Sequence, residues 1–168
     1  MFSTWAGFLV DFRSRLVLVV ETQADLLRAQ LELARIGYDN IDGFTLASDL
    51  GAAATLAQRS VCDLKLALEQ GAAPRVLDVR TPAEWTQSHI NGAIHIPLPR
   101  LLFRLSELPR DEPLAVVCGS GYRSSIAASL LASRGFHVQN VVGGMAAFEN
   151  TQCSDWQPSD LVFAGKAK

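Results

Sequence analysis

The sequence predicts an α/β domain with a mainly parallel, central sheet over residues 56–150. From residue 60 onward, apolar runs of strand length alternate with helical patterns, and the connections between them are short. One run, 114–117, leads directly into Cys118, a glycine-rich turn and a new helical pattern. Ligands bind at the carboxyl ends of the strands in such sheets, so we expect a site to form around Cys118.

The elements of this domain follow from local signals. Ser60 is suited to cap a helix that Gly71 ends, and Thr81 forms a capping box with Glu84 at the start of another helix. The expected order is helix 60–70, strand 75–80, a helix from 81, strand 93–97, helix 101–108, strand 114–117, a helix from about 123 to 135, strand 138–142 and a short helix ending near 149.

The first 55 residues contain a partial copy of the same pattern. The strand residues 18–20 align with 116–118, a helix follows in both, and 40–43 aligns with 140–143 after a two-residue insertion. Val20 takes the place of Cys118, and the turn after it lacks glycine. We interpret residues 1–55 as a degenerate, incomplete repeat with a docking role, joined to the complete domain 56–150 through the alanine-rich stretch 47–58. Residues 151–168 form a C-terminal tail.

Composition excludes several classes of function. The net charge of -2 gives no electrostatic reason to expect nucleic acid or a membrane surface as a partner. The apolar N-terminus is interrupted by Asp11, Arg13 and Arg15, which argues against a membrane span or a signal peptide. Three cysteines without disulfide or metal spacing predict free thiols and a reducing cytoplasm.

Cys118 is the strongest candidate for chemistry. Gly119 and Gly121 allow the backbone to curl, so that successive N–H groups and a helix start surround the sulfur. Such a field favours the thiolate, which is the reactive form of cysteine. Arg123 is a cation at a helix start, where the dipole disfavours it, and its planar fork suits sulfonate, sulfate or phosphate oxygens.

These residues resemble those of the rhodanese-like sulfurtransferases. The matching segments are 76–80 (VLDVR), 84–85 (EW), 89–97 (HINGAIHIP), 118–124 (CGSGYRS) and 142–145 (VGGM). The resemblance implies a five-stranded parallel sheet in three layers and a Cys118 nucleophile that accepts a sulfane sulfur. It also implies a substrate-binding loop formed by Gly119, Ser120, Gly121, Tyr122, Arg123 and Ser124.

The resemblance also suggests the reaction and its reactants. Thiosulfate or glutathione persulfide would donate sulfur, and a thiophilic acceptor such as cyanide or a thiol would remove it, with neither cofactor nor metal required. Four residues separate Cys118 from Arg123, as in sulfurtransferase members, whereas related phosphatases have one more. The alternatives are a non-catalytic persulfide carrier or interaction module and, ranked lower, a phosphatase-like or arsenate-reductase-like activity.

The N-terminal segment, with 2–7 (FSTWAG) and 34–40 (ARIGYDN), is similar to the incomplete repeat in proteins that fuse a metallo-β-lactamase-fold domain to rhodanese repeats. A metallo-β-lactamase-fold partner or fusion is therefore expected, although no metal motif of that fold is present here. The oligomeric state is left open.

The remaining polar residues carry weaker expectations. Asp78 and Arg80 end the neighbouring strand and either support the site or form a structural pair. Tyr122 either lines the mouth of the pocket or is simply exposed. His89 and His95 lack a further ligand at useful spacing, so no metal site is expected.

Overall fold

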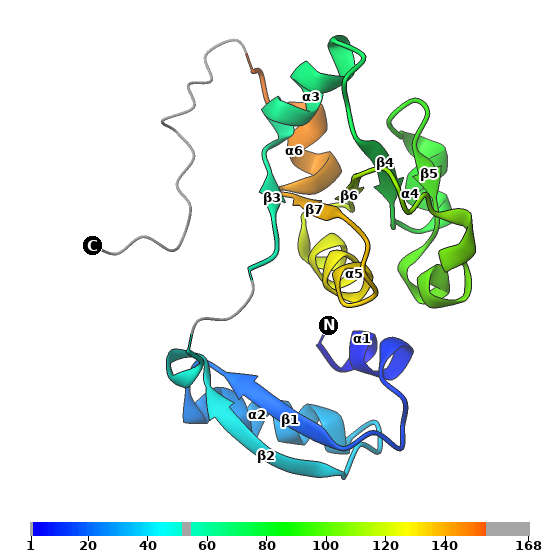
Figure 1. The fold of residues 1–168 in the computed structure, drawn as a ribbon. Helices are drawn as coiled ribbons and strands as arrows, with labels where there is room; N and C mark the ends of the chain where they lie inside the picture. The colour runs from blue at the N-terminus through cyan, green and yellow to red at the C-terminus, as the bar shows by residue number, and fades with distance from the viewer. Residues whose placement is uncertain (1, 52–54, 154–168) are drawn as a thin grey trace. The chain divides into compact units, whose positions relative to one another are not determined.

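The computed structural model describes residues 2–51 and 55–153 (Figure 1). Contacts between Cα atoms divide the chain into two compact units, Met1–Thr55 and Leu56–Lys168. In the residues described, helices are too short or too polar to cross a membrane. The predicted junction 47–58 and tail 151–168 fall partly on residues 52–54 and 154–168, which lie outside the described residues.

The first unit is built on a parallel β-α-β arrangement. Thr22 caps its central helix by accepting a hydrogen bond from the N–H of Asp25, and Leu26 and Leu33 bury one face of that helix. The Tyr38 hydroxyl donates to the carbonyl of Val10 at 2.6 Å and ties the chain after the helix to the segment before the first strand. The elements are α1 (Phe2–Leu9), β1 (Leu16–Val20), α2 (Gln23–Ala34), β2 (Ile41–Leu46) and the 3-10 helix η1 (Ala47–Asp49).

The register of β1 and β2 differs from the one that the predicted alignment of the two segments implies. Val116 pairs with Asn140 in the second unit, and Leu18, which aligns with Val116, pairs with Phe44. Phe44 rather than Asn40 therefore takes the place of Asn140. The sequence alignment of this second strand was wrong by four residues, because a glycine at position 43 imitates the glycine that follows the last strand of the second unit.

The second unit contains a five-stranded sheet in which all paired strands are parallel, in the order β3-β7-β6-β4-β5. This confirms the predicted fold class. The strand that precedes Cys118 is the central one, with all four of its residues buried. The strands are β3 (Gln58–Arg59), β4 (Arg75–Asp78), β5 (Ile94–His95), β6 (Leu114–Val117) and β7 (Val138–Val141).

Helices cover both faces of this sheet (Figure 1). Helices α3 and α6 pack together on one face, where Leu64 and Met145 join Ala115, Val117 and Val141 in the core. Helix α5 packs on β6 and β7 at the other face. The remaining elements are α3 (Val61–Glu69), α4 (Pro82–Gln87), η2 (Leu98–Phe103), η3 (Leu105–Glu107), α5 (Tyr122–Ala132) and α6 (Gly144–Asn150).

The local helix signals are confirmed where side chains cap backbone groups. Ser60 accepts from the N–H of Asp63, and Thr81 and Glu84 form the predicted capping box. The expected helix 101–108 was wrong, since this stretch contains the 3-10 helices η2 and η3. Arg104 separates them with a φ of -123°, which lies outside helical geometry.

The cysteines differ from the sequence expectation. Cys62 and Cys153 form a disulfide across 91 positions of sequence, and Cys118 is the free cysteine of the described residues. The prediction of three free thiols was therefore wrong. Packing of α3 on α6 brings Cys62, near the start of α3, beside the segment that follows α6, and no short spacing in the sequence signals this. Lys65 adds a hydrogen bond to the carbonyl of Thr151 at 2.8 Å in the same place.

Candidate active site

Cys118 lies at the carboxyl end of the central strand β6, directly before the loop that leads into α5. Its side chain is fully buried. Gly121 caps α5 with a φ of +101°, in the left-handed region that side chains disfavour. A Cβ there would lie 3.3 Å from the backbone nitrogen of Gly143. The turn therefore requires glycine at 121 both for its conformation and for its close approach to β7.

The sulfur of Cys118 lies among hydrogen-bond donors. The N–H of Gly121 donates to Sγ at 3.1 Å, and the Ser124 hydroxyl lies within hydrogen-bond distance at 3.4 Å. Burial acts to raise the pKa of the thiol, but the Ser124 hydroxyl and the N–H groups of residues 120, 121 and 124 outweigh it. The pKa of Cys118 therefore lies below that of an ordinary cysteine, and the thiolate is favoured.

Helix α6 orients the first two peptide groups of this loop. The N–H of Met145 donates to the carbonyl of Cys118 at 2.7 Å, and that of Ala146 donates to the carbonyl of Gly119 at 2.9 Å. The C=O and N–H of a trans peptide point in opposite directions, so the N–H groups of residues 119 and 120 point away from α6. Gly144 permits this contact, because a Cβ on it would lie 2.3 Å from the Cys118 carbonyl oxygen.

Arg123 is held by the carboxylate of Glu84, which was predicted as part of a helix cap but not as a site residue. Its Nη1 and Nη2 donate to the two carboxylate oxygens of Glu84 at 2.8 and 2.6 Å. The hydrogen bond from Arg123 lowers the pKa of Glu84 to about 2, against the opposing effect of burial. The guanidinium is thus fixed beside the loop: its Nη2 lies 3.0 Å from where a Cβ on Gly119 would stand. The segment match around Glu84 was the one sequence signal for this role.

Ser124 connects the thiol to a second strand. Its hydroxyl lies 2.6 Å from Oδ1 of Asn140 in β7, and Nδ2 of Asn140 donates to Oε1 of Gln58 in β3 at 2.8 Å. Ser124 and Asn140 are both buried, whereas Gln58 is exposed. Ser124 was predicted as part of the loop, whereas no pattern in the sequence singled out Asn140 or Gln58.

Asp78 and Arg80, predicted as possible support, bind each other. Two hydrogen bonds run from Arg80 Nε to the Asp78 carboxylate at 3.1 and 2.9 Å, a third runs from Nη2 at 2.7 Å, and Nη2 also donates to the carbonyl of Ser88. Both side chains are buried. The pair thus binds the end of β4 to the chain between α4 and β5. Tyr122 is 42% exposed at the first position of α5.

His89 and His95 stack on Trp85. The ring centroids lie 4.0 and 4.6 Å from that of Trp85, and the planes differ by 13° and 8°. Nδ1 of His89 hydrogen-bonds the carbonyl of Trp85, and Nε2 of His95 that of Arg80. Across residues 2–51 and 55–153, no three His, Cys, Asp or Glu side chains lie close enough together to hold a metal ion.

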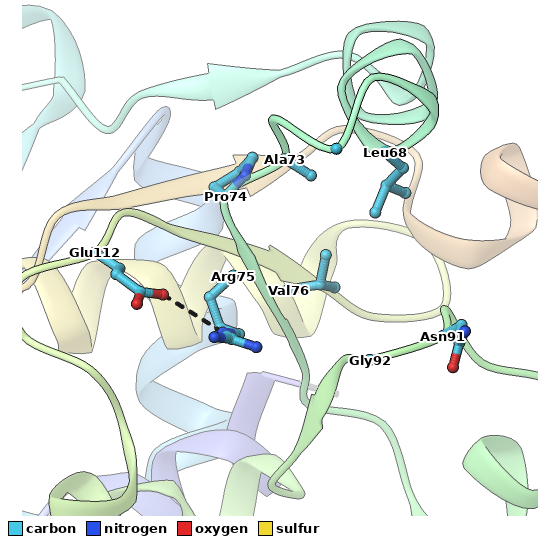
Figure 2. A pocket seen from close by; sticks show the side chains of 9 residues that line it. Leu68, Ala73, Pro74, Arg75, Val76, Asn91, Gly92 and Glu112 are labelled. Atoms are coloured by element: carbon cyan, nitrogen blue, oxygen red, sulfur yellow. Dashed lines mark ion pairs between the residues drawn. The ribbon is translucent and has the colours of Figure 1, made fainter.

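A cavity of about 300 Å³ lies near the amino end of β4, at the end of the strands opposite to that of Cys118 (Figure 2). It is lined at the amino end of β4 by Pro74 and Arg75, with Asn91 and Gly92 from the chain before β5. Arg75 forms an ion pair with Glu112 at 3.5 Å across its wall. Since Cys118 follows the carboxyl end of β6 in a parallel sheet, this cavity is separate from the thiol site.

Fold and geometry together define an α/β domain that holds a hydrogen-bonded thiol at the carboxyl edge of its parallel sheet. Residues 60–151 match the family described as the Rhodanese-like domain. The chain belongs to this family, as the resemblance of its segments predicted.

Relatives of this domain are named for sulfur chemistry. The putative sulfur carrier protein YrkF of Bacillus subtilis is 42% identical over 71 residues, which are 42% of this chain and 38% of that protein. The thiosulfate sulfurtransferase PspE of Escherichia coli is 36% identical over 75 residues, 43% of this chain and 72% of that protein. The crystal structure of a rhodanese-related protein from Thermoplasma volcanium has 32% identity and a TM-score of 0.52, covering 55% of this chain and 90% of that one. The chain therefore spans well under half the length of the first of these relatives.

Proposed function

We propose that this protein is a sulfurtransferase that moves a sulfane sulfur through a persulfide on Cys118. The donor is thiosulfate or a persulfide such as glutathione persulfide, and the acceptor is a thiophilic nucleophile. The family membership and the names of the relatives support the class of reaction. The observation that carries the mechanism is a buried thiol whose pKa is lowered by converging hydrogen-bond donors.

The proposed reaction is a double displacement. The Cys118 thiolate attacks the outer sulfur of the donor, a new S–S bond forms, and sulfite or a thiolate leaves with the electron pair of the broken bond. The acceptor then attacks the outer sulfur of the Cys118 persulfide and releases the Cys118 thiolate again. No net oxidation of the protein occurs, because each step forms one bond to sulfur and breaks one.

The loop supplies what each step needs. We propose that the N–H groups that stabilise the thiolate at Sγ also stabilise the negative charge of a persulfide, since they belong to a fixed turn. Arg123 binds Glu84 through two of its five N–H groups, which leaves further donors for the anionic part of the donor molecule. The four residues between Cys118 and Arg123 favour sulfur over the larger phosphate group.

Cys118→Ser tests this proposal. We expect turnover with thiosulfate or glutathione persulfide as donor, and cyanide or a thiol as acceptor, to fall to the uncatalysed background while the domain stays folded. Ser125→Ala is the matched control, because the Ser125 hydroxyl bonds the Tyr122 carbonyl and does not contact the sulfur. Transfer retained by Cys118→Ser would refute the assignment of the nucleophile.

A persulfide carrier without turnover is the second candidate, favoured by the name of the Bacillus subtilis relative. Mass spectrometry after donor treatment separates the two. A mass gain of one sulfur atom on Cys118 that small acceptors do not remove would indicate a carrier for a partner enzyme. Release of phosphate from an aryl phosphate would indicate instead the phosphatase-like alternative.

We also propose that residues 1–55 are a degenerate half-repeat used for docking. Their parallel β-α-β arrangement has the same order as β6-α5-β7, and Val20 stands where the second unit has its thiol. A metallo-β-lactamase-fold domain, fused or separate, is the partner we propose. Pull-down with such a domain, comparing the whole chain with a chain that begins at residue 56, tests this role.

A further inference from the structure

The Ser124 hydroxyl is surrounded by more acceptors than it can serve. Its oxygen lies 2.6 Å from Oδ1 of Asn140, 3.1 Å from the carbonyl of Gly121 and 3.4 Å from Sγ of Cys118. A hydroxyl has one proton to donate. Donation to Asn140, at the shortest of these distances, therefore competes with donation to the sulfur of Cys118.

The orientation of the Asn140 amide decides this competition. In the orientation observed, Oδ1 faces Ser124 and Nδ2 donates to Gln58. If the amide turns over, Nδ2 donates to the Ser124 oxygen, and the hydroxyl proton is then directed to another acceptor, which includes Sγ. The amide side chain of Gln58 can turn with it, because Gln58 is exposed and its one other bond, to the carbonyl of Leu56, can be replaced by water.

We propose that Asn140 is a positioning residue, which, together with Gln58, determines whether the Ser124 hydroxyl donates to Asn140 or to the sulfur of Cys118. A negative sulfur, thiolate or persulfide, favours the orientation in which Asn140 donates, since each group in the chain then donates toward the charge. The edge strand β3 thus contributes to the thiol site through the amide of Gln58, which acts on the amide of Asn140 in β7. This inference rests on Cys118 being the reactive thiol of the proposed function.

Asn140→Asp tests the inference. An ionised Asp is an acceptor only, so it keeps the Ser124 proton and also adds a negative charge. We expect the pKa of Cys118 to rise by about one unit, which is a roughly tenfold slower alkylation by iodoacetamide at a pH below the pKa. The readout is the pH profile of Cys118 alkylation. It requires no sulfur donor, so it stays informative even if the turnover assay shows no sulfur transfer.

The Ser124→Ala background separates the hydrogen-bond relay from the direct effect of charge. Direct repulsion between the introduced carboxylate and the thiolate persists without the hydroxyl, whereas the relay does not. We expect Asn140→Asp to shift the pKa clearly less in the Ser124→Ala protein than in the wild type. An equal shift in both backgrounds would overturn the inference, and so would a loss of stability with an unchanged pH profile. Arg123 from α5 and Glu84 from α4, the charged groups beside the loop, are the same in all these proteins.

Gln58→Glu provides the same test at an exposed position, where the fold tolerates change. Its carboxylate accepts only, so it holds Nδ2 of Asn140 and leaves Oδ1 toward Ser124. We expect a rise in the pKa of Cys118 that again shrinks when Ser124 is replaced by alanine. If Asn140→Asp does not fold, this variant alone decides the question: a shift that is independent of Ser124, or no shift, contradicts the role of the two amides.

Discussion

The guanidinium of Arg123 is held by Glu84 through two short hydrogen bonds, so its charge is largely balanced before any donor molecule arrives. The same Glu84 carboxylate also accepts hydrogen bonds from the N–H and the hydroxyl of Thr81 in the capping box. The start of α4 and the site loop are thereby connected through one side chain. A change at position 84 should consequently be seen in stability as well as in donor binding.

Glu84→Gln should lower the free energy of unfolding in a pH-dependent way. The Arg123 hydrogen bond lowers the pKa of Glu84 from 4.5 to about 2. The carboxylate therefore stabilises the folded state fully above pH 4.5, and this contribution is lost as the pH falls to about 2. At pH 7 we expect a loss of about 1–2 kcal/mol, reduced by solvent screening because a third of the Glu84 side chain is exposed.

Urea denaturation of both proteins between pH 7 and pH 2.5 measures this difference. Glu107→Gln is the matched control: Glu107 also forms a forked pair, with Arg104, but on the surface and away from the loop. We expect that control to change stability less. If the difference between Glu84→Gln and the wild type stays constant over the pH range, the ionised pair is not its cause.

At this scale the sequence predicts the residues of the loop and misses their distant partners. Cys118, Gly121 and Ser124 could be identified because a strand end, a glycine turn and a helix start are adjacent in the sequence. Glu84 lies 39 positions from Arg123, and Gln58 lies 82 from Asn140. Such pairings depend on which strands become neighbours, and no local pattern encodes that.

Among the elements, α6 is the one that shapes the site without contributing a side chain to it. Its N-terminal N–H groups bind the carbonyls of Cys118 and Gly119, and this contact depends on the absence of a Cβ at position 144. The short helix thus sets the direction of the peptide groups that follow the thiol.

Gly144→Ala should disturb this contact severely. The new methyl group would stand 2.3 Å from the Cys118 carbonyl oxygen, and the φ of +56° disfavours any side chain. We expect a loss of roughly 2–4 kcal/mol in stability together with a higher pKa of Cys118, because the loop must move. Urea denaturation and the pH profile of alkylation measure the two effects.

Gly135→Ala is the control for backbone conformation alone. Its φ is +79°, but no atom lies within 4 Å of the added Cβ. It should cost only about 1–2 kcal/mol and leave the pKa of Cys118 unchanged. If the two variants behave alike, the contact between α6 and the loop is unimportant.

The elements themselves were largely predictable, since Ser60 and Thr81 cap the helices expected of them. One exception is the expected helix 101–108, where leucine spacing suggests an α-helix and the chain forms 3-10 turns instead. The same apolar spacing fits both structures, and Arg104 breaks the run with its own backbone angles.

For the whole molecule, the disulfide is the feature least accessible from the sequence. One of its cysteines lies near the start of α3 and the other follows α6, so the bridged segment contains the strands β4, β5, β6 and β7 of the sheet. Alternation of strands and helices predicts the sheet. Only the packing of α3 on α6 shows that Cys62 and Cys153 come together.

Reduction of this bridge should destabilise the second unit. Joining residues 62 and 153 restricts the unfolded chain over a long loop, and bridges of this kind typically contribute about 2–4 kcal/mol. We expect hydrogen exchange of the buried β6 amides to accelerate on reduction. Thiol titration of the oxidised, denatured chain should find one free thiol, and three after reduction.

The double variant Cys62→Ala/Cys153→Ala completes this test, because it removes the bridge and keeps Cys118. Its β6 amides should exchange at about the rate found in the reduced wild type, and reductant should have no further effect on them. Since β6 ends at Cys118, the same openings that release its amides also expose the thiol. Where opening limits the rate, Cys118 should therefore be alkylated more slowly in the bridged protein than in the double variant. Three titratable thiols in the untreated chain, or equal exchange with and without the bridge, would show that the bridge does not stabilise this unit.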